Sequence, residues 1–390
     1  MAYAFSLGDV EFLRGEAGRT ALAEMSARPL ADATRIADVA AARTLAGSHG
    51  PAVLETAVLR RKAAAKLANA DDWLFTDPAL QQATATPVAE HRAQRLVGRD
   101  VHDVTCSVGA DLAVIARVAR HAVGSDLDPV RLAMARHNCG PGPLLLNADA
   151  LHPTTRGTAI VADPARRDDS GRRHWRPADL VPRLDLLAEA YAGRDLAVKC
   201  SPGLDFAAVG WADEVELVSL EGTVREACLW TRDLATPGVR RRATVLRDGA
   251  QWTITDAEPD DAPVLPIGAW IVDPDGAVVR AGLVRHYAVR HGLGQLDPRI
   301  AYLTGDEPPR GIRAFRVLEH AKYSEKALRA LLRARSVGTL EILVRGLDVD
   351  PNTLRKRLKL AGEVSATVVL TRVGDTPTAI LCHAVRTVGT

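Results

Sequence analysis

Apolar residues in the first part of the chain recur at the spacing of an α-helix. Over residues 9–86 the residues Ala, Leu, Arg and Glu dominate, and pairs such as Val53 and Ala57 fall on one helical face. Gly and Pro residues interrupt the helical pattern near Pro29, near 47–51 and at 77–78. The pattern therefore predicts a helical N-terminal domain over residues 1–86.

Short apolar runs that alternate with helical stretches mark the next part of the chain, from about residue 88 to 235. The runs begin at residues 101, 121, 143, 158, 195 and 214. Runs that are apolar throughout and separated by helices are typical of a parallel sheet covered on both faces. We expect an α/β domain here and place it at residues 87–300.

Residues 301–390 combine both patterns. A helix is expected over 311–334, a strand over 338–346 and a second helix over 350–362. The final residues alternate between apolar and polar on both sides of a Gly-Asp turn, which is typical of a β-hairpin. The sequence predicts a small α+β domain at the C-terminus.

Composition restricts the classes of function. The chain has 390 residues and a formal net charge of +2, so contact with a polyanion must come from local basic patches. The five cysteines form no CxxC pair, which argues against a zinc site or a disulfide framework and favours a reducing compartment. The start has no signal-peptide pattern and no long apolar run follows, so we expect a cytoplasmic protein without membrane spans or a metal.

Aspartates follow four successive expected strands, at Asp103, Asp126, Asp149 and Asp163. In an open α/β sheet, ligands bind outside the carboxyl ends of the strands. A carboxylate after the second strand can accept hydrogen bonds from both ribose hydroxyls, and one after the third can accept from an adenine amine. Gly109, in the loop after the first strand, lets the backbone approach a ligand closely.

Together with the loop DVTCSVGADL, these acids give the region a specific resemblance. It resembles class I S-adenosylmethionine-dependent methyltransferases, and most of all their RNA-modifying members, including the trimethylguanosine-synthase-like group. The resemblance implies a Rossmann-like sheet and S-adenosylmethionine as the cofactor. It also implies that Gly109 approaches the methionine part, Asp126 holds the ribose, Asp149 lies by the adenine, and Asp103 fixes the first loop.

The loop DVTCSVGADL, the expected cofactor loop, departs from the family pattern in one respect. Thr105 and Ser107 stand where two glycines are usual, and this makes a dinucleotide-binding site less expected. Gln82 and Thr84 lie in the segment before the first expected strand. This segment resembles the one that closes over the cofactor in many such methyltransferases. The expected cofactor-binding residues are therefore Gln82, Thr84, Asp103, Thr105, Gly109, Asp126 and Asp149.

The segment DPAR at 163–166 follows the fourth expected strand. Related enzymes that methylate nitrogen commonly carry an aromatic residue where Arg166 stands, and an arginine can instead stack on a base or bind a phosphate. The expected catalytic residues are Asp163, Pro164, Arg166 and Lys199. Cys200 resembles the nucleophile of uracil carbon-5 methyltransferases, but a buried structural thiol is the favoured interpretation.

Two basic segments indicate RNA. The loop after the DPAR segment combines positive charge with an aromatic ring, as single-stranded nucleic acid requires, at Arg172, Arg173, Trp175 and Arg176. The C-terminal part resembles a THUMP-like domain, a relative of RNA-binding THUMP modules. There Lys322 and Lys326 are expected on one basic helix face.

The leading hypothesis is a methyltransferase that modifies a base in rRNA or tRNA, built from an α/β Rossmann-like methyltransferase sheet, an N-terminal helical domain and a C-terminal α+β THUMP-like domain. One alternative is a small-molecule methyltransferase. Another is a non-catalytic RNA-binding or assembly factor with a degenerate methyltransferase fold, which the missing glycines of the cofactor loop would support.

Overall fold

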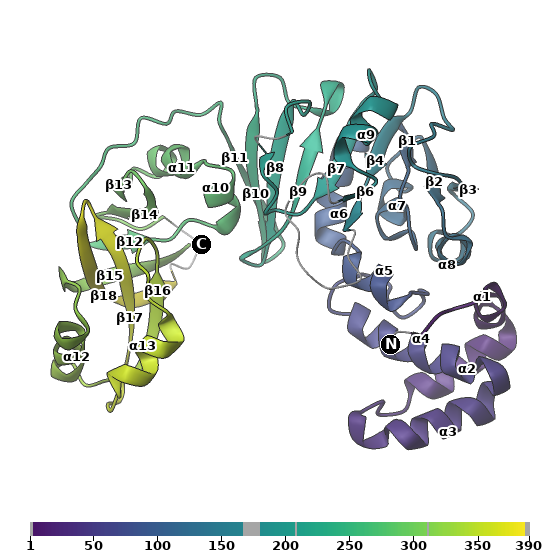
Figure 1. Ribbon diagram of the computed structural model, residues 1–390, viewed down its shortest axis with the longest axis horizontal. Coiled ribbons are helices and arrows are strands. Elements are labelled where there is room, and N and C mark those ends of the chain that lie inside the picture. Colours follow the sequence, from purple (N-terminus) through teal and green to yellow (C-terminus); the bar gives the residue numbers. More distant parts are fainter. Residues whose placement is uncertain (1–2, 167–179, 207–208, 310–311, 387–390) are drawn as a thin grey trace. The chain divides into compact units, whose positions relative to one another are not determined.

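The computed structural model in Figure 1 describes residues 3–166, 180–206, 209–309 and 312–386. The chain forms two compact units, the first made of residues 1–237 with 246–249 and the second of 238–245 with 250–390. Their boundary falls in the hairpin of β10 (Arg241–Arg247) and β11 (Ala250–Thr255). The domain limits expected near residues 86 and 300 stay predictions.

The first unit contains a mostly parallel sheet, in which the order of its own strands is β8-β9-β7-β4-β1-β2-β3. The bounds are β1 (Asp100–Asp103), β2 (His121–Asp126), β3 (Leu144–Asn147), β4 (Ala159–Ala162), β7 (Leu196–Cys200), β8 (Glu214–Leu220) and β9 (Thr223–Trp230). The first five of these pair in parallel, as the sequence predicted. Strand β9 is antiparallel to both neighbours and was not predicted. A separate pair, β5 (Ala165–Arg166) and β6 (Leu180–Val181), follows β4.

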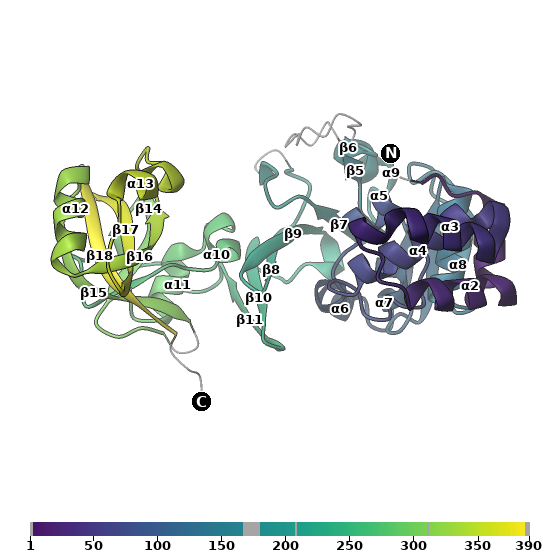
Figure 2. The same cartoon turned by 90° about the horizontal axis from the view of Figure 1, so that it is seen from below.

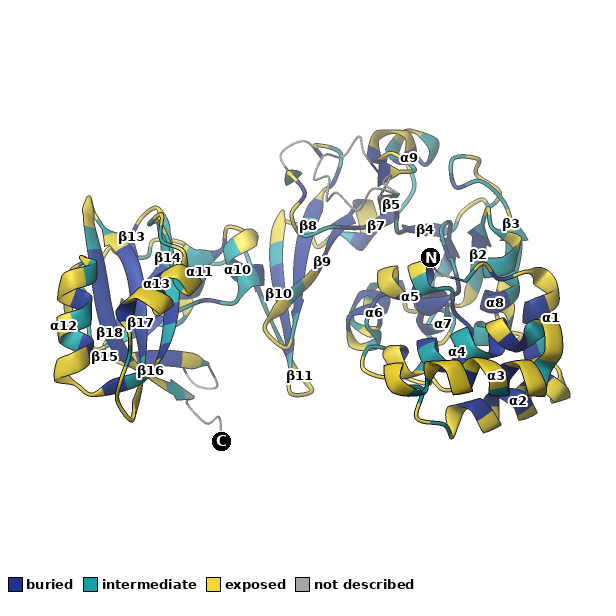
Figure 3. Ribbon diagram, turned by 60° about the horizontal axis from the view of Figure 1, so that its bottom comes forward, coloured by how far each residue is buried: buried dark blue, intermediate teal, exposed yellow. Residues whose placement is uncertain are grey.

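Helices cover both faces of this sheet. The helices of the first unit are α1 (Leu7–Arg14), α2 (Glu16–Ser26), α3 (Arg35–Ala46), α4 (Gly50–Ala63), α5 (Asp77–Gln82), α6 (Thr86–Ala93), α7 (Ala110–Ile115), α8 (Pro129–Cys139) and α9 (Leu184–Ala190). On β4, Ile160 packs with Leu187 of α9, and the next residue, Val161, packs with Ile115 of α7. Alternate residues of a strand point to opposite faces, so both faces are buried at the central strands, of which β7 is mostly dark blue in Figure 3.

The N-terminal helices share a core with the loop after β1 and with α8. Leu13, Met25 and Val53 pack in one cluster with Val108 of the loop after β1 and with Met134 of α8. Helices α2, α3 and α4 lie on the side of α8 in Figure 2, and α1 contacts α8 directly. The apolar periodicity that predicted these helices is therefore the periodicity of faces buried among the helices themselves and against α8 and the loop after β1.

The amide of Asn138 on α8 ties three segments of the first unit together. Its Oδ1 accepts from the N–H of Leu74 at 2.8 Å, and its Nδ2 donates to the carbonyls of Leu74 at 2.9 Å and Val108 at 2.8 Å. Because Val108 lies in the loop after β1, this one side chain fixes that loop against the segment that precedes α5.

The second unit has a seven-stranded sheet of order β13-β14-β12-β15-β18-β17-β16. Its strands are β12 (Trp270–Val272), β13 (Gly294–Asp297), β14 (Ile300–Gly305), β15 (Arg313–Lys322), β16 (Val337–Val344), β17 (Val364–Val373) and β18 (Thr376–Arg386). Its helices are α10 (Gly276–Arg280), α11 (Val284–Arg290), α12 (Glu325–Ala334) and α13 (Pro351–Leu358). The predicted hairpin is confirmed as β17 and β18, joined at Gly374 with φ +59°.

The helix expected over 311–334 is wrong in its first half, because 313–322 form strand β15. This strand pairs with β18 over its whole length and with β12 at its start, where Ala314 and Phe315 are buried. Sheet pairing overrides a composition that favours a helix. The helix begins only at Glu325, capped by Ser324 Oγ, which accepts from the N–H of Ala327 at 3.2 Å. Lys322 therefore ends a strand and does not share a helix with Lys326.

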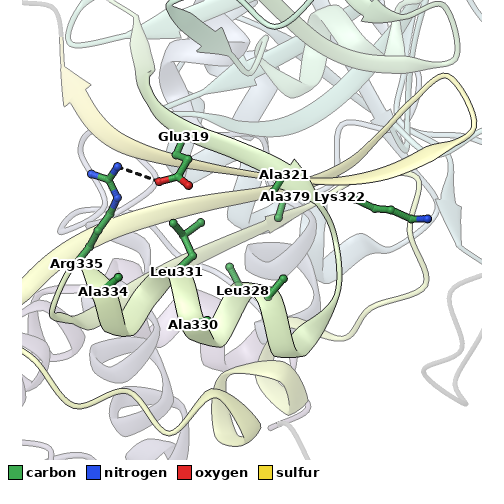
Figure 4. A pocket seen from close by; sticks show the side chains of 10 residues that line it. Glu319, Ala321, Lys322, Leu328, Ala330, Leu331, Ala334, Arg335 and Ala379 are labelled. Atoms are coloured by element: carbon green, nitrogen blue, oxygen red, sulfur yellow. Dashed lines mark hydrogen bonds and ion pairs between the residues drawn. The ribbon is translucent and has the colours of Figure 1, made fainter.

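A groove of about 690 Å³ separates α12 from β15 and β18 in the second unit (Figure 4). Leu328 and Leu331 point from the helix towards the strands, and Arg335 donates to Glu319 across one end at 3.0 Å. The other lining residues are Ala321, Lys322, Ala327, Ala330, Ala334 and Ala379. Alanines thus make up half of the lining residues, and Lys322 points away from the helix in Figure 4.

Candidate active site

The four predicted aspartates lie along one edge of the sheet. Asp163, Asp103 and Asp126 end or directly follow the neighbouring strands β4, β1 and β2, and Asp149 stands two residues after β3. The winding of the chain reverses between β1 and β4, so Asp103 and Asp163 flank the point where ligands bind in such sheets. The sequence placed these acids at strand ends because each stands at or shortly after the end of a parallel strand.

The loop after β1 keeps a glycine-like shape although two of its expected glycines are replaced. Ser107 has φ +49°, in the left-handed region, and its N–H donates to Asp126 Oδ2 at 3.0 Å. Gly109 has φ +86°, and a Cβ there would lie 2.5 Å from Sγ of Cys139. Gly109 is therefore required by both its conformation and its close contact, whereas Ser107 adopts a conformation that costs a non-glycine residue free energy.

Thr105 joins the ends of β1 and β4. Its backbone N–H donates to Asp103 Oδ1 at 3.2 Å, and its hydroxyl oxygen accepts from the N–H of Asp163 at 2.7 Å. A glycine at this position could make only the first of these contacts. The departure from the family pattern at Thr105 thus supplies a side chain that fixes the backbone of Asp163.

Asp103 is a buried carboxyl group with an available oxygen. It is 3% exposed, and in the described part of the chain its Oδ2 has no hydrogen-bond partner. Burial, with the nearby negative charges of Asp111 and Asp163, raises the pKa of Asp103 to about 8, against the opposing effects of the Thr105 N–H and of Arg92. Asp103 is therefore mostly protonated at neutral pH in the absence of a positively charged ligand.

Asp126 and Asp149 are less buried and present acceptors towards the same edge. Asp126 accepts from the N–H of Asp128 at 2.9 Å in addition to that of Ser107, so both of its oxygens are fixed in place. Asp149 Oδ1 accepts from the N–H of Leu151 at 2.9 Å. Each carboxylate still has lone pairs for a further donor.

Lys199 on β7 occupies the centre of the predicted catalytic group. Its ammonium donates to Asp163 Oδ2 at 2.5 Å, to Thr84 Oγ1 at 2.9 Å and to the carbonyl of Gln82 at 3.2 Å. Burial alone would lower the pKa of Lys199, but Asp163, Asp111 and other acids raise it, so the ammonium keeps its charge. The fold thus brings Gln82, Thr84, Asp163 and Lys199 together, although they were predicted from separate motifs.

Sequence reasoning missed three charged residues of this site. Arg92 of α6 is 3% exposed and donates to Glu226 Oε1 of β9 at 2.9 Å, and it forms an ion pair with Asp111 in the first turn of α7. Burial lowers the pKa of Arg92, but Asp111 and Glu226 outweigh it and raise that pKa. The only signal in the sequence was the position of Asp111 directly after the cofactor loop.

Cys200 lies next to Lys199 in the chain but packs into the core on the other side of β7. Its side chain belongs to the cluster that contains Ile160 and Leu187, and the residue is 6% exposed. Burial, with the negative charge of Asp163, raises the pKa of the Cys200 thiol far above its usual range. A buried neutral thiol cannot act as a nucleophile, so the geometry supports the structural role favoured by the sequence.

Several predicted residues take no part in these contacts or lie outside the described residues. Pro164 is buried directly after Asp163. The backbone of Arg166 lies in β5, but its side chain is outside the described residues, as are Arg172, Arg173, Trp175 and Arg176. Within the described ranges, no group of three or more His, Cys, Asp and Glu side chains is placed to hold a metal ion. No helix in those ranges is long and apolar enough to cross a membrane.

An open parallel sheet with acids at four neighbouring strand ends defines a Rossmann-like enzyme that binds a nucleoside cofactor. The chain is 55% identical over 340 residues to an uncharacterized S-adenosylmethionine-dependent methyltransferase of Mycobacterium tuberculosis, found in two strains, and this match covers 84% of the chain and 94% of the relative. The chain belongs to the S-adenosylmethionine-dependent methyltransferases, and its cofactor is S-adenosylmethionine.

Two further comparisons concern the fold and the ends of the chain. A crystal structure from Porphyromonas gingivalis W83, assigned provisionally as a methyltransferase, superposes with a TM-score of 0.75 at 20% identity and covers 97% of this chain and 99% of that one. It shares the fold. Residues 312–384 match the family described as THUMP domain-like, and residues 6–63 match a domain of unknown function (DUF8688).

Proposed function

We propose that this methyltransferase modifies a base in RNA, with rRNA and tRNA as the candidate substrates, and that it acts in the cytoplasm. The strand-end acids of the first unit would hold the cofactor and Asp163 would hold the target. The THUMP-like part of the second unit would bind the RNA. The choice of RNA rests on one observation: positive charge is concentrated in the THUMP-like part of the chain.

The residues at the sheet edge fit S-adenosylmethionine. Gly109 keeps the loop after β1 in the left-handed conformation, with Sγ of Cys139 packed against it where a side chain would be, so the backbone of this loop can face a ligand. Asp126 would accept from the ribose hydroxyls and Asp149 from the adenine amine. The unpaired Oδ2 of Asp103 would accept from the ammonium of the methionine part, whose positive charge favours the ionised form of this carboxyl group.

When bound, the cofactor supplies a methyl group activated by a positively charged sulfur. The protein's contribution is to hold the target in line with that group, since such a displacement depends mainly on orientation. Asp163 is suited to this task because Lys199 occupies only its Oδ2 and Thr105 fixes its backbone, which leaves Oδ1 to accept from an N–H group of the base. Lys199, fully charged and fully hydrogen-bonded, holds Asp163 in place.

The THUMP-like part carries the positive charge of the protein. Residues 312–384 contain 13 Lys and Arg against seven Asp and Glu, a formal charge of +6, while the whole chain carries only +2. The rest of the chain is therefore negative by four charges. A phosphate backbone is attracted to such a local excess of cations, independently of the net charge of the protein.

The basic side chains gather on α12 and α13. These helices are adjacent, because Arg329 of α12 donates to the carbonyl of Arg357 of α13 at 2.9 Å. In the described part of the chain, exposed cations without an ion pair occur on and beside both helices, at Lys326, Arg333, Lys356 and Lys359. The groove beneath α12 is lined by Ala and Leu with Glu319, Lys322 and Arg335, and by no aromatic ring that could stack a base, so we place the RNA on the outer helix faces.

Mass spectrometry of modified nucleosides tests the proposal. RNA from cells that lack the protein should miss one methylated nucleoside, and the purified protein with S-adenosylmethionine should restore it. An unchanged nucleoside profile, with S-adenosylmethionine still bound, would support a small-molecule methyltransferase. Failure to bind the cofactor would support a non-catalytic RNA-binding factor.

Salt dependence tests the RNA surface separately. Binding of the wild-type protein to bulk RNA should weaken steeply with salt, because each neutralised phosphate of a single strand contributes about 0.7 to the logarithmic slope. Replacement of Lys326, Lys356 and Lys359 by Ala should reduce that slope by about 2. Replacement of Arg335, which is paired with Glu319, is the matched control and should change it little.

A further inference from the structure

Six polar side chains form a continuous chain of contacts from the antiparallel strand β9 to the target side of the site. Each contacts the next by a hydrogen bond or an ion pair. In order they are Glu226, Arg92, Asp111, Thr84, Lys199 and Asp163. Only Lys199 and Asp163 stand where a substrate would be, so the first four need a separate explanation.

The hydroxyl group of Thr84 has no remaining hydrogen-bond capacity. Its hydrogen goes to Asp111 Oδ2 at 3.0 Å, because a carboxylate can only accept. Its oxygen accepts from Lys199 at 2.9 Å and from Arg92 at 3.3 Å. A hydroxyl oxygen has two lone pairs, and both are used. Thr84 is also 5% exposed, so nothing in its surroundings favours a direct contact with the cofactor.

The ammonium of Lys199 is saturated in the same way. Its three N–H groups point to Thr84, to the carbonyl of Gln82 and to Asp163. Two of these partners are held by the end of α5, at Gln82, and by the turn that follows it, at Thr84, so they determine where the third N–H points. The position of Asp163 Oδ2 therefore depends on Thr84 through Lys199.

Arg92 holds the start of this chain. Its guanidinium joins Glu226 to Asp111, and Asp111 in turn accepts the hydroxyl of Thr84. The planar group with fixed donors suits two carboxylates at once, which a lysine could not serve with the same geometry. Arg92 thereby keeps Asp111 in place as the acceptor that orients Thr84.

We propose that Thr84 and Arg92 are positioning residues, which act on methyl transfer through Lys199 and Asp163 and do not touch the cofactor. The claim revises the direct cofactor contact expected for Thr84. It requires only that the chain is a methyltransferase, and it holds whether the substrate is RNA or a small molecule. Its test can therefore succeed or fail independently of the RNA assignment.

The test compares Thr84→Val with Thr84→Ser in the full-length protein. Valine keeps the shape and removes the hydroxyl, while serine keeps the hydroxyl. Acetic anhydride at low concentration labels lysines according to their exposure and freedom, and mass spectrometry measures the label at Lys199, whose side chain is 13% exposed. Lys62, 60% exposed and outside the chain of contacts, is the internal reference. Calorimetry measures the affinity for S-adenosylmethionine in parallel.

Thr84→Val should raise the labelling of Lys199 relative to Lys62 by about fivefold or more, because a hydrogen bond to a charged group is lost. Its affinity for S-adenosylmethionine should stay within about twofold of the wild type. This is a small change, since a tenfold change in affinity corresponds to about 1.4 kcal/mol. Thr84→Ser should match the wild type in both measurements. Arg92→Lys should raise the labelling of Lys199 in the same direction.

Two results would overturn the proposal. A loss of cofactor affinity in Thr84→Val with unchanged labelling of Lys199 would make Thr84 a direct cofactor contact. Unchanged labelling and unchanged affinity together would remove Thr84 and Arg92 from any role in positioning Lys199.

Discussion

Lys199 and Cys200 are consecutive residues of β7 whose side chains lie in different environments. The ammonium of Lys199 is 2.5 Å from Asp163 Oδ2, while the thiol of Cys200 is buried with Ile160 in the core. Successive side chains of a strand point to opposite faces, so only one of the two can serve the site. This arrangement favours the scheme in which Asp163 and Lys199 act on the target over the scheme in which Cys200 attacks it.

Asp163→Ala should abolish nearly all methyl transfer, and Cys200→Ala should keep most of it. Asp163 is the acceptor that we propose holds the target, whereas the Cys200 thiol is buried and its pKa is raised. The measurement is transfer of a labelled methyl group to RNA from cells that lack the protein. Both variants should bind S-adenosylmethionine, which checks that they fold. A covalent adduct with 5-fluorouridine RNA, absent in Cys200→Ala, would reverse the assignment.

Asp126→Ala should weaken the binding of S-adenosylmethionine about ten- to a hundredfold, because a hydrogen bond to a charged acceptor contributes about 1.5–3 kcal/mol. Calorimetry on the folded variant measures the change. Asp100→Ala is the matched control, since Asp100 lies at the opposite end of β1 and pairs with Arg120. Equal dissociation constants for wild type and Asp126→Ala would remove Asp126 from the site.

Binding of S-adenosylmethionine should release a proton near neutral pH. The pKa of Asp103 is about 8 in the free protein, so the group is mostly protonated at pH 7. A positively charged ligand lowers that pKa, and the proton leaves on binding. Affinity should therefore rise with pH and level off above about 8. Calorimetry in buffers of different ionisation enthalpy detects the proton, and Asp103→Asn should show no release. Identical enthalpies in all buffers for the wild type would contradict this assignment.

Arg92→Met should destabilise the protein by about 3–5 kcal/mol, because Asp111 and Glu226 would remain buried without a cation. Urea unfolding followed by circular dichroism measures the loss. The double variant Arg92→Met, Glu226→Gln also removes one of the two carboxylates that lose their ion pair, so it should recover part of the stability. If the double variant were as unstable as the single one, the cost would lie in packing and not in charge.

Much of the first unit could be predicted because its strands are short apolar runs and its acids stand at the ends of those strands or within two residues of them. The strand β9 escaped prediction because Arg225 and Glu226 interrupt its apolar run. Glu226 is tolerated there only because Arg92, 134 residues away in the chain, reaches it in the folded protein. No local pattern records such a pair.

In the second unit, a helix was predicted where a strand forms. The residues of β15 have a composition suited to a helix, and the helix predicted for them is contradicted by their pairing with β18. In the site, the position of Asp103 after a strand was readable from the sequence, but the contact between Thr84 and Lys199 was not. That contact depends on how α5 and α6 pack against the sheet edge, which only the complete fold determines.

The packing of Val108 against the N-terminal helices has a consequence for how this enzyme can be divided. Val108 stands between Ser107 and Gly109, so the wall that supports the cofactor loop is built from residues that precede the sheet in the chain. An enzyme shortened to its catalytic sheet would expose Val108 and Met134 to water and leave the loop unsupported. The N-terminal helices are therefore part of the folded unit that contains the sheet, and removing them should destabilise the loop after β1.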